Sequence, residues 1–447
     1  MKIEASPLSQ LENRNLSRDY RAELRCQLSR ELEDKGDYEA ARQIMGELWR
    51  RIGERPHVEE LEQSAAGEVL LRAGVLTGWI GSKDQIKAQE IAKNLITESI
   101  TVFQSLNYGK KVAEAQIELA YCYWREGAYD EARDILREVV SRLSTDGELK
   151  AKAVLRSAIV EWSALRYKES LRILMEAAPL FERIKNHTIK GGYHNALAGV
   201  LEELGALEGR RDYLDRAFIE YTAAGFHFEQ AKHKNYRANV ENNLGYLFFK
   251  IHSFKKAHEH LERARHLLGN LKNRGAVAQV DETRARVFLA EGRYAEAERA
   301  ARSAVSWLEK GGQQGILAES LITHGRALAR LGYHSQAYAT LKRAVEAAQQ
   351  SGATDRAGEA ALTLIEELGE HLTLQKTQDT SSASGLADVR QYERELIKQA
   401  LIKTDGSITQ AARLLGTSHQ QLSFIIETRQ KELLALRTPI KRRRKRT

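Results

Sequence analysis

The sequence predicts an all-α protein: a stack of helical hairpins, or α-solenoid, followed by a small helical domain. Three observations predict this fold class. The 447 residues contain only four prolines, their apolar residues recur at helical rather than strand spacing, and many columns of residues between 245 and 344 repeat at an interval of 40. A single helical hairpin cannot bury its own apolar face, so repeated hairpins must stack on their neighbours.

The 40-residue repeat has a consistent physical pattern. A small residue on the first helix lets the second helix approach closely, and a large apolar residue one turn later fills the remaining space. A Gly-x-Tyr sequence, as in Gly292–Tyr294, then turns the chain, and a small anchor residue lies where the two helices pack most closely. The columns are Gly245, Ala285 and Gly325; Phe248, Phe288 and Leu328; Ala257, Ala297 and Ala337; Leu261, Ala301 and Leu341; and Ala264, Ala304 and Ala344.

The same pattern recurs upstream, as in Gly36, Tyr38 and Ala41, and it predicts about eight hairpins. Their anchors are Ala41, Ala88, Ala132, Ser170, Ala217, Ala257, Ala297 and Ala337. The repeat resembles the tetratricopeptide repeat (TPR) family in a 40-residue form. The resemblance implies an array over residues 15–374, similar to the sensory arrays of some bacterial regulators, that wraps a protein, a peptide or a small ligand.

A short polar segment separates this array from a second module. Residues 375–386 contain serines and Gly385, a composition that predicts a flexible linker. Residues 387–436 then predict three helices: one over roughly Asp388–Thr404, a short one capped by Ser407, and a third capped by Ser418 after a turn at Gly416. The inward-facing residues of the second and third helices include Ala411, Ala412, Leu415, Leu422 and Ile426.

The string ITQAARLLGTSHQQL resembles the Fis-type helix-turn-helix of bacterial regulators. The sequence departs from that family at Thr417, where Ile or Leu is usual, and at His419–Gln421, where Arg is common. The resemblance implies that the third helix enters the DNA major groove, where Gln can pair with adenine. The implied base-contacting residues are Thr417, Ser418, His419, Gln420, Gln421 and Ser423, and the implied phosphate-contacting residues are Arg413 and Arg429. Alternatively, the third helix is purely structural or binds protein.

The basic residues gather at the end of the chain. Residues 386–447 hold 14 Lys or Arg and 6 Asp or Glu, which accounts for the whole net charge of +8. The tail, residues 437–447, contains six consecutive cations: Lys441, Arg442, Arg443, Arg444, Lys445 and Arg446. Six phosphate contacts would give a slope of about −5 in a plot of the logarithm of DNA affinity against the logarithm of salt concentration. The tail is therefore interpreted as a phosphate-binding segment, and the alternative is a solvated, disordered run.

Other classes of protein leave no signal in the sequence. The N-terminal segment has no apolar run, and no stretch approaches the length of a membrane span, so we expect a cytoplasmic protein without a membrane partner. Cys26 and Cys122 are expected to be reduced packing residues. We find no catalytic motif and predict no enzyme activity, no cofactor and no metal. Six histidines between His227 and His266 could suggest a metal site, but solvated or packing roles explain them.

Two hypotheses of function follow. In the first, the chain is a DNA-binding transcriptional regulator whose array binds a protein, peptide or small effector. The Fis-type resemblance implies a homodimer that reads half-sites about one helical turn apart. In the second, the chain is an interaction scaffold whose C-terminal module binds nucleic acid weakly or nonspecifically. The aromatic repeat residues are expected to pack, whereas Trp79 and Trp124, with the three other tryptophans, either pack or line a groove.

Overall fold

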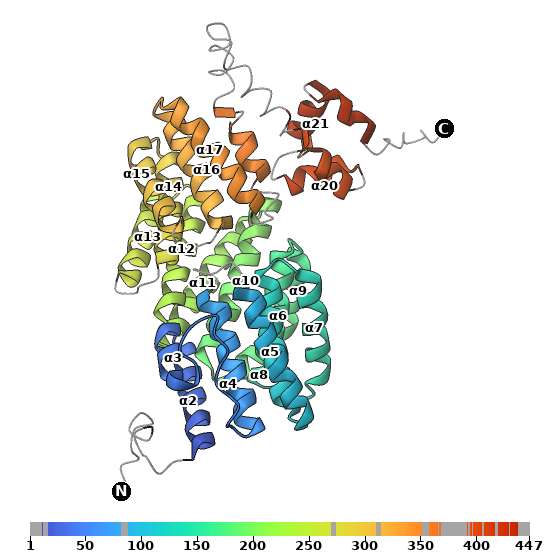
Figure 1. Cartoon of the computed structure of the whole chain (residues 1–447). Helices are drawn as coiled ribbons and strands as arrows, with labels where there is room; N and C mark the ends of the chain where they lie inside the picture. The colour runs from blue at the N-terminus through green and yellow to red at the C-terminus, as the bar shows by residue number, and fades with distance from the viewer. Residues whose placement is uncertain are drawn as a thin grey trace. The chain divides into compact units, whose positions relative to one another are not determined.

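The computed structural model is mainly helical in the part of the chain that it describes. The described residues are 11, 17–81, 88–269, 274–309, 314–350, 357–364, 366–367, 391, 394–395, 397–404, 406–415, 419–428 and 430–436. Within these ranges the secondary structure consists of helices and turns, with no strand. The predicted all-α class is confirmed (Figure 1).

The helices form eight successive pairs within the described residues. They are α2 (Arg18–Glu33) with α3 (Tyr38–Met45), α4 (Gln63–Leu76) with α5 (Ala88–Ser105), α6 (Gly109–Arg125) with α7 (Tyr129–Arg142), α8 (Glu148–Ser163) with α9 (Tyr167–Arg183), α10 (His187–Glu208) with α11 (Arg211–Gln230), α12 (Lys234–Lys250) with α13 (Phe254–Leu268), α14 (Arg274–Ala290) with α15 (Tyr294–Leu308), and α16 (Gln314–Arg330) with α17 (His334–Gln350). The short helices η1 (Gly46–Leu48) and η2 (Thr77–Gly81) follow α3 and α4. The prediction of about eight hairpins is confirmed.

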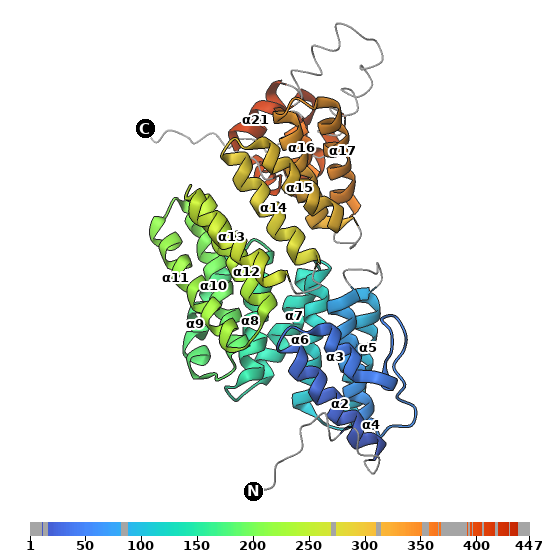
Figure 2. The same ribbon diagram turned by 90° about the vertical axis from the view of Figure 1, so that its left-hand side faces the viewer.

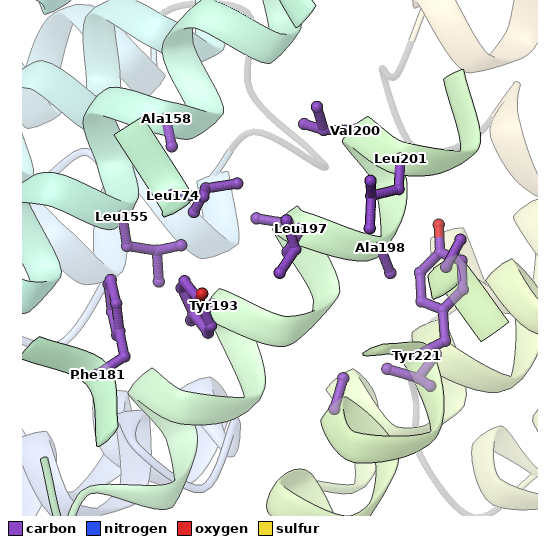
Figure 3. Close-up of a cluster of buried hydrophobic side chains, with 14 of the residues drawn as sticks. Leu155, Ala158, Leu174, Phe181, Tyr193, Leu197, Ala198, Val200, Leu201 and Tyr221 are labelled. Atoms are coloured by element: carbon purple, nitrogen blue, oxygen red, sulfur yellow. The ribbon is translucent and has the colours of Figure 1, made fainter. Parts of the chain in front are cut away.

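The chain divides into two compact units, Met1–Ala276 and Val277–Thr447. A large hydrophobic cluster of the first unit joins α8, α9, α10 and α11, and Figure 3 shows Leu155, Phe181, Tyr193 and Tyr221 within it. In the second unit, a cluster around Leu308 and Leu321 joins α15 to α16 and α17. Each cluster draws on several hairpins, as stacking requires.

All eight predicted anchor residues are buried, with at most 1% of their surface exposed. Ser170 fits an alanine position because its hydroxyl donates a hydrogen bond to the carbonyl oxygen of Ala158 at 2.7 Å. One anchor is displaced by a turn, however. Gly74 on α4 packs against Ala92 and Ile96, in the same relation that Gly245 has to Ala257 and Leu261. The equivalent of the other anchors in the second hairpin is therefore Ala92, whereas Ala88 packs against Gly81.

The small residues of the first helices are matched in size to their partners. A Cβ atom added to Gly245 would lie 2.6 Å from Cγ of Leu261, and one added to Gly325 would lie 2.5 Å from Cγ of Leu341. In the hairpin between them, alanine occupies both columns, as Ala285 and Ala301. The first column thus holds glycine where the second holds leucine, and alanine where the second holds alanine. Either combination fills the same space between the two helices of a hairpin.

This matching predicts a rescue between two destabilising substitutions. Gly245→Ala is expected to lower the free energy of unfolding by about 1–3 kcal/mol through overpacking, and Leu261→Ala by about 2–5 kcal/mol through a cavity. The double variant recreates the Ala285–Ala301 pair, so we expect a loss at least about 1 kcal/mol smaller than the sum. Urea unfolding of the full chain measures all three. Gly109→Ala, whose Cβ would meet nothing within 4 Å, is the control, and strict additivity would contradict the prediction.

A ladder of ion pairs connects the first helices of the first four hairpins. Arg72 on α4 is buried and lies 2.7 Å from a carboxylate oxygen of Glu33 on α2 and 3.1 Å from one of Glu114 on α6. Arg30 on α2 lies 2.7 Å from the same Glu114 oxygen. The ladder ends at α8, where Lys152 pairs with Glu118 of α6. These ion pairs join α2, α4, α6 and α8 within the first unit (Figure 2).

The first unit closes on itself, because its first hairpin contacts the fifth and sixth. The side-chain amide of Asn235, at the start of α12, donates a hydrogen bond to the carbonyl oxygen of Gly36 at 3.0 Å. The hydroxyl of Thr188 on α10 donates one to the carbonyl oxygen of Asp34 at 3.2 Å. A Cβ atom on Gly36 would lie 2.4 Å from the ring of His233, and Gly36 has a φ of +75°, so glycine is required there on both counts. These contacts join residues about 150–200 positions apart in the sequence.

His233 is the buried N-cap of α12. Its Nδ1 accepts a hydrogen bond from the backbone N–H of Tyr236 at 3.2 Å, and the two rings stack with centroids 3.8 Å apart. Only 1% of its surface is exposed. Burial lowers the pKa of His233 to about 4, below its usual value of 6.5. The neutral imidazole is therefore the form that the fold requires.

His233 should make the first unit sensitive to acid. Because the folded-state pKa lies below the unfolded-state value, the unfolded chain binds the proton first, and stability falls as the pH drops from about 6.5 to about 4. We expect a loss of about 2 kcal/mol between pH 7 and pH 5 from this residue. His233→Asn keeps a cap acceptor but does not titrate. Urea unfolding should therefore show a shallower decline in the variant, and an unchanged pH dependence would contradict the assignment.

Cys26, Cys122 and His260 have packing or hydrogen-bonding roles. Cys26 and Cys122 are free and buried, which confirms the prediction of reduced packing residues. His260 stacks on Phe248 and pairs with Glu241 at 2.9 Å. In the described part of the chain, no group of three His, Cys, Asp or Glu side chains is arranged to hold a metal ion.

Candidate nucleic-acid interface

The C-terminal module packs short helices around its own core. The described elements are helical residues 397–403, α20 (Ile408–Leu414), α21 (His419–Thr428) and the 3-10 helix η4 (Lys431–Leu436). Ala411 and Leu401 are fully buried, and Ala412, Leu422 and Ile426 are at most 1% exposed. The burial predicted for Ala411 and Ala412 of α20, and for the inward-facing residues of α21, is therefore confirmed.

The turn into α20 follows from local chemistry. Gly406 has a φ of +77°, and its N–H donates to the carbonyl oxygen of Leu401 at 2.8 Å, which ends the preceding helix. Ser407 then caps α20, because its hydroxyl accepts a hydrogen bond from the N–H of Gln410 at 3.5 Å. The predicted cap at Ser407 is present.

The outer face of α21 is polar with one large apolar residue. His419 and Gln420 are exposed at its N-terminal end, where base contacts would be made. Ser423 is half-buried, and its hydroxyl donates to a carboxylate oxygen of Glu427 at 3.3 Å. Phe424 is 59% exposed. The sequence of α21 contains no Lys or Arg, so this helix brings no cation to a phosphate backbone.

The remaining predicted contact residues are only partly located. Arg413 and Gln421 lie within α20 and α21, but their side chains are outside the described residues. Thr417, Ser418 and Arg429 lie outside the described residues altogether, as do Lys441, Arg442, Arg443, Arg444, Lys445 and Arg446. The linker assigned to 375–386 is also outside them. The structure brings together His419, Gln420 and Ser423 on one helix, and the other assignments stay predictions.

Sequence reasoning missed three features of this module. Phe424 lies one helical turn after Gln420, and apolar side chains at such a place can contact the thymine methyl group. Leu433 of η4 completes the core with 4% of its surface exposed. Gln430 is buried and accepts a hydrogen bond from Nε of Arg394 at 3.1 Å, which ties η4 to the first helix. The i, i+4 spacing of Gln420 and Phe424 was a usable signal.

The module also contacts the end of the repeat array within the second unit. Leu362, in helical residues 357–364, packs against its hydrophobic core. A Cβ atom on Gly358 would lie 3.1 Å from Cδ2 of Leu415. The core of the helix-turn-helix is thus extended by an apolar side chain from outside residues 387–436.

Comparison with known families identifies both parts of the chain. Residues 388–423 match the model of the Fis family of bacterial regulatory proteins. Residues 113–142 and 318–351 match the tetratricopeptide repeat model. The chain therefore carries tetratricopeptide repeats and a Fis-type helix-turn-helix at its C-terminal end, as the sequence predicted. No curated protein matches the sequence.

Solved structures resemble the chain in fold. A Rap protein complexed with Competence and Sporulation Factor is 14% identical, with a TM-score of 0.54 over 84% of this chain and 100% of that one. A signal-transduction ATPase with a tetratricopeptide repeat sensor from Pyrococcus horikoshii is 15% identical, with a TM-score of 0.50 over 87% of this chain and 65% of that one. Yeast Tom70 is 10% identical, with a TM-score of 0.50 over 96% and 86%. At these identities the likeness concerns the helical-repeat fold alone.

No described helix of the chain is both long enough and apolar enough to cross a membrane.

Proposed function

We propose that this chain is a cytoplasmic, non-enzymatic DNA-binding transcriptional regulator. Its helix-turn-helix docks on DNA as part of a homodimer, and its repeat array binds the protein, peptide or small effector that controls it. The observation that carries the proposal is the exposed N-terminal end of α21, with His419 and Gln420 free of the module's core. A fully packed core behind that face is what a recognition helix needs, because base readout requires side chains held in fixed positions.

The test is the binding of genomic DNA fragments by the purified full-length chain. A regulator should enrich a discrete motif, and Gln420→Ala should relax the preference at one base position by about 1–3 kcal/mol. Gln104→Ala, an exposed glutamine on α5, is the matched control and should leave the motif unchanged. Base readout by this helix would be excluded if the chain bound all sequences equally, or if Gln420→Ala enriched the same motif as the wild type.

A second function, an interaction scaffold, is favoured by the composition of α21. Phe424 is exposed there, Glu427 adds a negative charge, and the helix has no Lys or Arg. Such a surface suits a protein partner better than a phosphate backbone. Under this reading Phe424→Ala abolishes capture of a protein and leaves DNA binding unchanged. Under the regulator reading the same variant lowers the affinity for the enriched motif.

A further inference from the structure

The first three hairpins of the first unit assemble an aromatic stack. Tyr38 at the start of α3 stacks on Trp79 of η2 with centroids 4.8 Å apart. Trp79 stacks on Tyr121 of α6, also at 4.8 Å, and Tyr121 on Trp124 at 5.1 Å. Three successive hairpins thus present their rings to one another, and of the two alternatives for Trp79 and Trp124, packing against other rings is the one observed.

Arg156 of α8 lies against this stack without an ionic partner. Its guanidinium carbon is 3.9 Å from the centroid of the Tyr121 ring. Among the described residues it has no carboxylate within ion-pair distance and no hydrogen-bond acceptor. Arg72 and Lys152, the neighbouring cations of the ladder, both pair with glutamates. A ring face attracts a cation but gives its N–H groups no lone pair, so the donors of Arg156 remain available.

Arg156 is surrounded by several helices but is still partly exposed. Burial alone would lower its pKa, yet Tyr121, Glu118, Tyr236 and Tyr38 together raise it above the usual value. These neighbours come from α6, α12 and α3, so protein surrounds the guanidinium on several sides. Arg156 is nevertheless only half-buried, so part of its surface stays open to a ligand.

Tyrosine hydroxyls complete the surroundings. The pKa values of Tyr38 and Tyr121 are raised, chiefly by burial, and in Tyr38 also by Tyr236 through its electrostatic effect and a side-chain hydrogen bond. The hydrogen bond raises the pKa of Tyr38 because Tyr38 donates it to Tyr236, so the hydroxyls of Tyr121 and Tyr236 are the ones left to donate to a ligand. Tyr236 reaches this place because Asn235 and His233 fix the start of α12 against Gly36.

We propose that Arg156, with the hydroxyls of Tyr121 and Tyr236, binds the oxyanion of the effector, either a carboxylate or a phosphate. The planar guanidinium matches such a group with two parallel hydrogen bonds, and the hydroxyls supply further donors. A ligand held there bridges α6, α8 and α12, so it strengthens the closure of the first unit. The inference rests on the proposed sensing role of the array and names the chemistry that it recognises.

The test is thermal unfolding of the full-length chain with inorganic phosphate or benzoate, against sodium chloride at equal ionic strength. One of the two anions should raise the unfolding temperature of the wild type beyond the chloride control. Arg156→Gln should weaken that affinity about tenfold or more, as loss of a charge-assisted hydrogen bond does. Arg137→Gln, an exposed arginine on α7, is the matched control and should respond as the wild type does.

The outcomes distinguish a carboxylate ligand from a phosphate ligand, and they distinguish failure of the anion site from failure of the proposed DNA-binding function. Stabilisation by benzoate alone identifies a carboxylate, and stabilisation by phosphate alone identifies a phosphate. If Arg156→Gln fails to fold, Arg156→Lys serves instead, because it keeps the charge and loses the planar fork, so benzoate affinity should fall. No shift with either anion, or equal shifts in wild type and Arg156 variants, overturns the site. The fragment-binding assay on the wild type reports separately on the DNA-binding function.

Discussion

Arg72→Met is expected to lower the free energy of unfolding of the first unit by about 3–5 kcal/mol. Arg72 is 2% exposed and neutralises Glu33 at 2.7 Å and Glu114 at 3.1 Å. Methionine keeps much of the volume but leaves the buried carboxylates without this partner. Burial already raises the pKa of Glu33 to about 7, despite the lowering effect of Arg72. Urea unfolding followed by circular dichroism measures the change.

The pH dependence of this variant gives a second readout. The unfolded Glu33 has a pKa of about 4.5, and the folded value is higher, so its ionisation costs stability as the pH rises through that interval. The loss in Arg72→Met should therefore be smaller at pH 5 than at pH 8. Arg137→Met at an exposed pair is the control and should stay within about 0.5 kcal/mol. A loss below about 1 kcal/mol would show that the ladder contributes little.

Deletion of Lys441–Arg446 is expected to reduce DNA affinity by up to about ten-thousandfold at 0.15 M salt. The reason is that α21 contains no Lys or Arg, so phosphate contacts must come from elsewhere in the chain. Six phosphate contacts give a slope of about −5 when the logarithm of the affinity is plotted against the logarithm of the salt concentration. With this slope the affinity rises roughly ten-thousandfold between 1 M and 0.15 M salt. Fluorescence anisotropy with one DNA duplex over a salt series gives both the affinity and the slope.

The control for the tail is a variant in which all six residues are lysine. It keeps the charge and should keep the slope, because counterion release depends on charge rather than on side-chain shape. The enriched motif should be weakened but still present after deletion, since phosphate contacts position a protein without reading sequence. A slope that changes by less than about one unit on deletion would exclude the tail as the main phosphate contact.

Local regularities of the sequence predicted much of the fold. The column of Ala257, Ala297 and Ala337 predicted buried helix contacts because small residues must recur wherever helices cross at the same distance. Gly406 and Ser407 predicted the start of α20 because a positive φ and a cap acceptor are local requirements. The predicted anchor was displaced by one helical turn only in the second hairpin, because Ala88 and Ala92 are both small and lie one turn apart.

Contacts between distant segments were beyond sequence reasoning. Nothing in the composition around Gly36 or Asn235 marks them as partners, because a backbone carbonyl accepts from any donor. The same holds for Arg156, which resembles an ordinary surface cation until α3 and α12 are brought around it. In the C-terminal module, Gln430 was missed because a buried polar side chain is defined by its partner, here Arg394.

The hydrogen bond between Gly36 and Asn235 also sets an order of events during synthesis. Its two residues are 199 positions apart, so at about 5–20 residues per second the ribosome needs roughly 10–40 s to make the second after the first. During this interval the nascent first hairpin exposes Tyr38 and its turn without their final partners. Stalling translation before and after α12 emerges, with limited proteolysis of the first hairpin, would therefore reveal whether the array first grows as an open chain and becomes protected only when α12 arrives.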